Sequence, residues 1–241
     1  MAGNLMQPLR SAIALGSRAP ALVAFGVALA THTIVRAVQV QAFEAADPAP
    51  WLNLLLYLGP VAMSAILIIF LARTLLIDAH GYGRPLIGRF AGLYLLAVIL
   101  FEFVGFAGSI AIFSAGPSPL LLLYGSPVVS GLASAAAFPL FVRCFATAAG
   151  IEEPRLSTVW AFVFGGGRAV YFWYALSAIG LNLLSAFTFA NLLPAGEGNS
   201  LPGNLVQSFI SATAQILRCL LDVVAVRMLV SGWQEDVEVF A

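Results

Sequence analysis

The sequence contains no lysine, and all 11 of its basic residues are arginine. Charged residues of both signs make up only 9% of the 241 residues, against about a quarter in soluble proteins. The formal net charge is zero, so no basic surface points to a nucleic-acid partner. The hydrophobic share of 61% and the mean hydropathy of +0.98 indicate a membrane protein. A lysine-free chain rich in arginine and alanine is also typical of GC-rich bacterial genomes.

Residues that carry catalysis or bind metals are scarce. No Cys-x-x-Cys, His-Glu-x-x-His or Gly-x-Ser-x-Gly motif occurs in the chain. Two histidines, His32 and His80, cannot supply a three-histidine metal site. The two cysteines, Cys144 and Cys219, are expected to be free apolar thiols rather than a disulfide. We therefore expect no enzyme activity, no cofactor and no metal.

Long apolar stretches dominate the chain instead. A membrane core of about 30 Å requires about 20 apolar residues per helix. Six stretches meet this length, at residues 20–42, 51–77, 89–114, 119–148, 168–193 and 205–231. Residues 4–18 are shorter and amphipathic, which predicts an interfacial helix. The expected fold is all-α: one polytopic membrane helix bundle over residues 1–241. The first stretch continues past His32, so a membrane helix is expected there rather than a cleaved signal peptide.

Arginines mark alternate ends of these stretches. They precede the first stretch and recur between the second and third and between the fourth and fifth. Residues 43–50, 114–119 and 194–204 contain no basic residue. Because arginine and lysine are retained on the cytoplasmic side of short loops, this alternation predicts that both termini are cytoplasmic. With the bacterial composition, it predicts a multi-pass protein of the inner membrane.

Apart from the arginines near the span ends, five charged or histidine residues fall within the predicted spans. Such residues are costly in a bilayer and generally face protein or water. They are His32, Arg36, Glu102, Arg218 and Asp222. One interpretation is a structural network, in which Arg218 pairs with Asp222 on its own helix or with Glu102 across helices. The other is a transport path in which Glu102 and His32 exchange protons. The few other polar residues in the spans favour the first interpretation.

Two further patterns each leave two interpretations open. Tyr-x-x-Pro-Val occurs at both Pro60 and Pro127, which is consistent with a duplicated hairpin or with prolines in the first turn of a helix. The segment Gly165, Gly166, Gly167 and Arg168 before the fifth span is either a flexible joint or a cradle for an anion. Small residues four apart, such as Gly26/Ala30, Gly105/Ser109, Ser130/Ser134 and Ala133/Ala137, predict tight helix packing.

Residues 138–173 resemble a segment of bacterial six-helix membrane proteins. The pattern is a helix ending at Arg143, then Leu156-Ser157, Trp160, the three glycines and Arg168. It is similar to YciC-like proteins and to the membrane domain attached to some glycerophosphodiester phosphodiesterases. The resemblance implies a six-span layout with an amphipathic N-terminus, and it carries over no functional residue.

Taken together, these features predict a non-enzymatic accessory or scaffolding subunit of a larger membrane complex. Its partners would be the lipid bilayer and other membrane protein subunits. The alternative is a small transporter or channel with an intramembrane charged site at Glu102, Arg218, Asp222 and His32. A third hypothesis, a lipid-handling enzyme, would use the cytoplasmic turn residues Glu152, Glu153, Arg155 and Arg168.

Overall fold

A computed structural model describes residues 5–44, 50–76, 87–114, 116, 118–188 and 201–240 of the chain. In these residues the regular structure consists of eight helices and includes no strand. The helices are α1 (Gln7–Gly16), α2 (Ala19–Glu44), α3 (Pro50–Leu75), α5 (Ile87–Ser114), α6 (Pro119–Ala149), α7 (Leu156–Phe164), α8 (Arg168–Phe187) and α9 (Leu201–Phe240). The all-α prediction is confirmed for this part of the chain.

Six of these helices are long and apolar enough to cross a membrane. They are α2, α3, α5, α6, α8 and α9, and each lies on one of the six predicted spans. Lengths of 20 to 40 residues per helix meet or exceed the requirement of about 20 residues for a bilayer. The chain therefore has the helices of a multi-pass membrane protein.

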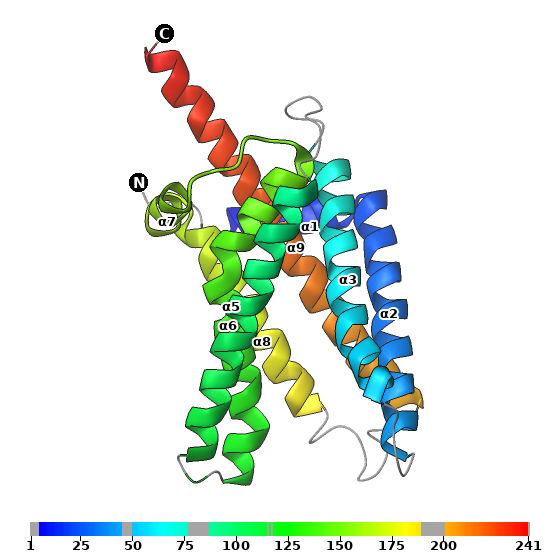
Figure 1. Cartoon of the computed structure of the whole chain (residues 1–241). Helices are drawn as coiled ribbons and strands as arrows, with labels where there is room; N and C mark the ends of the chain where they lie inside the picture. Colours follow the sequence, from blue (N-terminus) through cyan, green and yellow to red (C-terminus); the bar gives the residue numbers. More distant parts are fainter. Residues whose placement is uncertain are drawn as a thin grey trace.

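The long helices form two groups, which are joined by α9 and by direct packing of α3 on α6. In Figure 1, α2 and α3 stand on one side and α5, α6 and α8 on the other, while α9 runs obliquely between them. α9 packs against α1, α2, α3, α6 and α8, so it contacts both groups. α5 packs mainly on α6 and leaves most of its own surface outside the protein core. This arrangement places α6 and α9 at the centre of the molecule.

One end of the molecule, which we call the arginine-rich end, gathers α1, α7 and the C-terminal end of α9 (Figure 1). α1 runs across this end and buries Pro8, Ala12 and Leu15 against the bundle. Its N-terminal side is held by the Trp173 indole, which donates a 2.6 Å hydrogen bond to the Leu5 carbonyl. The described arginines near this end are Arg10, Arg18, Arg73, Arg89, Arg143, Arg155, Arg168 and Arg227. The location of α1 in a membrane interface remains a prediction.

Large buried side chains fill the contact between α6, α8 and α9. Phe138 of α6 and Tyr174 of α8 are fully buried, with ring centroids 4.6 Å apart. Leu221 of α9 is also fully buried in the same cluster. Because lipid is as apolar as leucine, close packing of this kind supplies much of the association between membrane helices.

The closest helix approaches occur at glycines that the small-residue pattern did not single out. A Cβ on Gly131 of α6 would lie 2.5 Å from the Ile179 side chain and 2.8 Å from its Cα on α8. A Cβ on Gly108 of α5 would lie 2.4 Å from Val129 of α6. A Cβ built on Gly26 or on Gly105 would have no neighbouring atom within 4 Å. The prediction that these two glycines mediate tight helix packing is therefore wrong.

Both repeated prolines lie inside long helices. Pro60 is within α3 and Pro127 within α6, so the interpretation as first-turn prolines is wrong. A proline in a helix interior removes one backbone hydrogen bond and frees the carbonyl one turn earlier. Pro60 lines the cavity described below.

Candidate functional site

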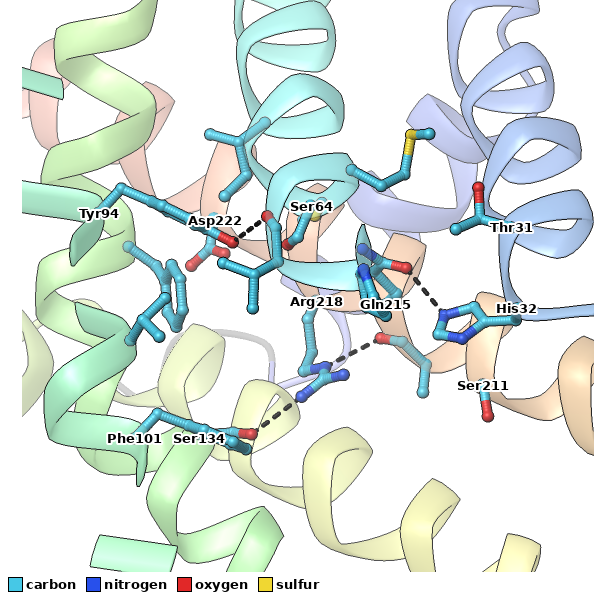
Figure 2. A pocket seen from close by; sticks show the side chains of 18 of the residues that line it. Thr31, His32, Ser64, Tyr94, Phe101, Ser134, Ser211, Gln215, Arg218 and Asp222 are labelled. Carbon is cyan, nitrogen blue, oxygen red and sulfur yellow. Dashed lines mark hydrogen bonds between the residues drawn. The ribbon is translucent and has the colours of Figure 1, made fainter. Parts of the chain in front are cut away.

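A cavity of about 360 Å³ lies between the two helix groups (Figure 2). Its polar lining comes from all six long helices: Thr31, His32, Ser64, Tyr94, Glu102, Ser134, Asn182, Ser211, Gln215, Arg218 and Asp222. The remaining wall is largely apolar and includes Ile68, Val98, Phe101 and Phe141. Cavities that bind small molecules typically enclose about 300–1,000 Å³ and combine an apolar wall with a few polar groups. This cavity has both properties.

α9 contributes a polar stripe to this cavity. Ser211, Gln215, Arg218 and Asp222 are three or four positions apart, which places them along one face of a helix. The sequence spacing thus positions all four side chains on the surface that faces α3 and α5. The same spacing predicted that Arg218 and Asp222 would share a face.

Arg218 is held by hydrogen bonds to neutral acceptors. Its Nε donates to the Ala214 carbonyl at 3.1 Å, and its Nη1 donates to the Ser134 hydroxyl on α6 at 2.9 Å (Figure 2). Ser134 in turn donates to the Ser130 carbonyl at 3.0 Å. A guanidinium has five N–H donors, so most of its donor capacity stays available to the cavity.

Asp222 lies one helical turn away from Arg218 and is only 3% exposed. Its Oδ1 accepts no hydrogen bond among the described residues. Neither Asp222 nor Glu102 forms an ion pair with Arg218 within 4.0 Å in the described structure. The expected ion-pair network around Arg218 is therefore not formed. A buried carboxylate without a partner is costly, and such groups in a native structure call for an explanation.

His32 of α2 contacts α9 on another wall of the cavity. Its Nε2 lies 3.0 Å from Oε1 of Gln215, and the pair bridges the two helices (Figure 2). With that nitrogen carrying the proton, the ring donates to the amide oxygen. Arg36, one turn further along α2, is not among the residues that line the cavity.

Glu102 lies on the face of α5 turned toward the cavity. Tyr94, Val98, Phe101 and Glu102 all line it, and their spacing corresponds to one stripe of the helix. Glu102 itself is exposed and has no ion pair among the described residues. The Tyr94 hydroxyl donates a 2.8 Å hydrogen bond to the Val61 carbonyl, which ties α5 to α3 at the cavity wall. The cavity thus brings together four of the five predicted intramembrane residues.

The glycine segment before α8 forms a tight turn. The Gly165 and Gly167 amides both donate to the Phe162 carbonyl, at 3.1 and 2.8 Å. A Cβ on Gly167 would lie 2.2 Å from the Phe162 ring, so any other residue there would require this ring to move. Two of the three glycine amides are therefore used inside the turn, which leaves the anion-cradle interpretation with fewer donors and still a prediction. Gly166 lines a second cavity of about 350 Å³ at the arginine-rich end, together with Arg18 and Arg227.

The turn between α6 and α7 is held by ion pairs. Glu153 contacts both Arg89 of α5 and Arg143 of α6, and its side chain is 4% exposed. This carboxylate anchors the turn through its two ion pairs. The lipid-enzyme hypothesis stays a prediction. Among the described residues no cluster of three or more histidine, cysteine or acidic side chains is arranged to hold a metal. His80 lies outside the described residues.

Sequence reasoning missed several residues of the cavity. Ser64 and Tyr94 line it from α3 and α5, but each is a single polar group in an apolar span and gives no periodic signal. A scan against protein-family models found no match, and neither the search of curated proteins nor the search of solved structures found one. The resemblance of residues 138–173 stays a prediction.

Proposed function

We propose that this protein is a small transporter that binds a polar solute in the cavity between the two helix groups. The proposal is carried by one observation: Arg218 and Asp222 both line the cavity, and neither forms an ion pair among the described residues. A charged residue at the centre of a membrane helix costs about 2.5–3.5 kcal/mol on insertion scales. Two such residues facing a cavity fit a binding site better than dry structural packing.

The helix arrangement supports transport by alternating access. α2 and α3 form one group, and α5, α6 and α8 the other, around a site to which α9 contributes Arg218 and Asp222. Many transporters move solutes by rocking one helix group against another around a fixed midplane site. The Tyr94–Val61 hydrogen bond between α5 and α3 would have to break in such a motion.

Glu102 and His32 provide groups for proton coupling. Both line the cavity, and carboxylate and imidazole side chains within membrane spans commonly form proton relays. Protonation of His32 would add a donor at its second ring nitrogen while Nε2 stays beside Gln215. We propose that solute movement is coupled to a proton gradient through these two residues.

Flux through reconstituted protein tests this function. The full-length protein is placed in liposomes with an internal pH dye and supplied with labelled amino acids, organic acids and amines. We expect uptake of at least one class, coupled to a pH change, and a loss of at least tenfold in Asp222→Asn and Glu102→Gln. Glu152→Gln, which neutralises an exposed carboxylate outside the cavity, is the matched control. No flux of any ion or solute by the wild-type protein would contradict the proposal.

The orientation and location of the protein follow from the same proposal. The arginine-rich end is assigned to the cytoplasm by the positive-inside rule, which places α1, α7 and the end of α9 there. The lysine-free composition favours a bacterial inner membrane. Reporter fusions at the C-terminus test this, because alkaline phosphatase is active only outside the cytoplasm and green fluorescent protein fluoresces only inside it.

A second candidate is the accessory or scaffolding subunit. The observation that favours it is the outer surface of α5, where Leu95, Ile99, Phe103, Phe106 and Ile110 are all at least half exposed. Either lipid or a partner helix would cover this surface. Extraction in mild detergent followed by native mass spectrometry separates the two: a lone monomer excludes the subunit role, whereas a stable complex with other proteins supports it.

A further inference from the structure

We infer that the cavity receives a small zwitterion, with an ammonium group bound at Asp222 and an acidic group bound at Arg218. This inference rests on the proposed function and specifies the substrate class of the same site. Its basis is that one cavity presents a buried acceptor and a cationic donor, one helical turn apart, which form no ion pair within 4.0 Å in the described structure.

Asp222 supplies the acceptor. It is 97% buried, and its Oδ1 lacks a hydrogen-bond donor among the described residues. An unpaired buried acceptor costs about 1–3 kcal/mol, and more when it is charged. An ammonium group has three N–H donors and no acceptor, so at the cavity side of the Asp222 carboxyl group it supplies a donor and a compensating charge together. A neutral hydroxyl would satisfy only the hydrogen bond.

Arg218 supplies the donor. Nε and one hydrogen of Nη1 are engaged by Ala214 and Ser134, and those acceptors carry no charge. The other N–H groups have no protein acceptor in the described structure, although the residue lines the cavity. The hydrogen bond to Ser134 holds the guanidinium in place before the ligand arrives. Guanidinium groups of this kind bind carboxylate and phosphate groups through two parallel hydrogen bonds.

The spacing of the two residues fits a ligand that carries both charges. Four residues along a helix correspond to a rise of about 6 Å. Side chains at this spacing can form an ion pair, but the guanidinium is turned to Ser134 and forms none with Asp222 within 4.0 Å in the described structure. The gap that remains between the two groups suits a ligand whose two charged groups lie a few bonds apart. A simple anion would leave Asp222 without a partner, and a simple cation would be repelled by Arg218. Only a ligand with both charges completes both sites.

The rest of the wall limits the ligand to a small one. At about 360 Å³ the cavity lies near the lower end of the range for small-molecule sites. Apolar side chains such as Val98, Phe101 and Phe141 surround the charged pair, which suits a short hydrocarbon part. Two sources share this chemistry: a free amino acid, and the headgroup of an ethanolamine phospholipid that enters from the bilayer.

Binding to the full-length protein tests the inference. The protein is placed in nanodiscs of phosphatidylglycerol, a lipid without an amine, and titrated with alanine, propionate and isopropylamine. A second series uses γ-aminobutyrate, butyrate and butylamine. We expect one zwitterion to bind at least tenfold more tightly than both of its single-charge analogues. In a separate arm, native mass spectrometry compares retention of phosphatidylethanolamine and phosphatidylglycerol. Selective retention of phosphatidylethanolamine identifies the lipid headgroup as the source.

Variants then assign the two halves of the site. In Asp222→Asn the ammonium group has no anionic acceptor, so the zwitterion should bind no more tightly than propionate. In Arg218→Gln the acidic group has no cationic donor, so the zwitterion should bind no more tightly than isopropylamine. The comparison of analogues on wild-type protein stands even if a variant does not fold. Equal affinity for a zwitterion and one analogue, or failure of every zwitterion and of phosphatidylethanolamine to bind, overturns the inference. If the inference fails but the protein transports another solute, the proposed function still stands. If a zwitterion binds but no solute is transported, the proposed function is contradicted and the inference about the ligand stands.

Discussion

The guanidinium of Arg218 on α9 donates a 2.9 Å hydrogen bond to the hydroxyl of Ser134 on α6. This bond joins the two most buried helices across the cavity and fixes the direction of the only cationic side chain that lines it in the described structure. The position of the charge therefore depends on a neutral residue of another helix.

Replacing Ser134 by alanine should lower binding more than stability. Hydrogen bonds between membrane helices contribute about 1 kcal/mol or less, so a small decrease in the unfolding midpoint is expected for Ser134→Ala. Ligand affinity should fall several-fold, because Arg218 loses the contact that orients it. Thr147→Val removes a buried hydrogen bond to the Arg143 carbonyl, at 2.8 Å, and neither of these residues lines the cavity. Equal affinity losses in both variants would contradict an orienting role for Ser134.

The cavity should be open to water, whereas the outer surface of the same helix should not be. On a background with Cys144 and Cys219 replaced by alanine, Ser64→Cys places a thiol in the cavity wall, and Ile66→Cys places one on a surface that is 58% exposed. A charged methanethiosulfonate reagent reacts with a hydrated thiolate and not with a thiol in lipid. We expect labelling at residue 64 to be at least tenfold faster. Comparable rates at both positions would mean that the cavity is dry.

Glu153 should stabilise the fold without taking part in transport. Its side chain is 4% exposed and contacts both Arg89 and Arg143. Removing one member of a buried ion pair costs about 3–5 kcal/mol; because Arg89 is 60% exposed, we expect the lower end of this range for Glu153→Gln. Glu152→Gln, at the adjacent exposed position, should leave the unfolding midpoint unchanged. Catalytic turnover of a phospholipid that is lost in Glu153→Gln but kept in Glu152→Gln would instead revive the enzyme hypothesis.

Gly131 should be far less tolerant of a methyl group than Gly180. An alanine Cβ at residue 131 would lie 2.8 Å from the backbone Cα of Ile179, whereas at residue 180 nothing lies within 4 Å. Overpacking of this kind costs about 1–3 kcal/mol, and backbone atoms cannot move aside easily. Thermal unfolding in detergent should show a lower midpoint for Gly131→Ala and no decrease for Gly180→Ala. A decrease of similar size in both variants would show that α6 and α8 do not approach this closely.

The sequence was sufficient for the helices but not for their contacts. Each membrane helix follows from an apolar run of sufficient length, and the shared face of Arg218 and Asp222 follows from their spacing. Gly105 and Gly108 are both in α5, yet only Gly108 meets a neighbouring helix. Which face of a uniformly apolar helix turns inward depends on the shapes of its neighbours, and the composition of the helix does not encode it.

The same limit explains the candidate site. The intramembrane charges could be found because each is rare in an apolar span, and four of them line one cavity. Their pairing could not be found, since Arg218 and Glu102 are on different helices and ion pairing requires a distance below 4 Å. Tyr94 was missed because a tyrosine in an apolar helix is ordinary until its hydroxyl is seen to bond the Val61 carbonyl of α3.

The length of α9 has a practical consequence. A helix of 40 residues is about 60 Å long, twice the thickness of the hydrocarbon core of a bilayer. The candidate membrane span within α9 ends at Val230, so the last turns extend beyond this span as a stalk at the arginine-rich end. An affinity tag or a fiducial antibody epitope attached to this stalk would be held away from the lipid and the cavity, which makes it the natural handle for immobilisation and electron microscopy.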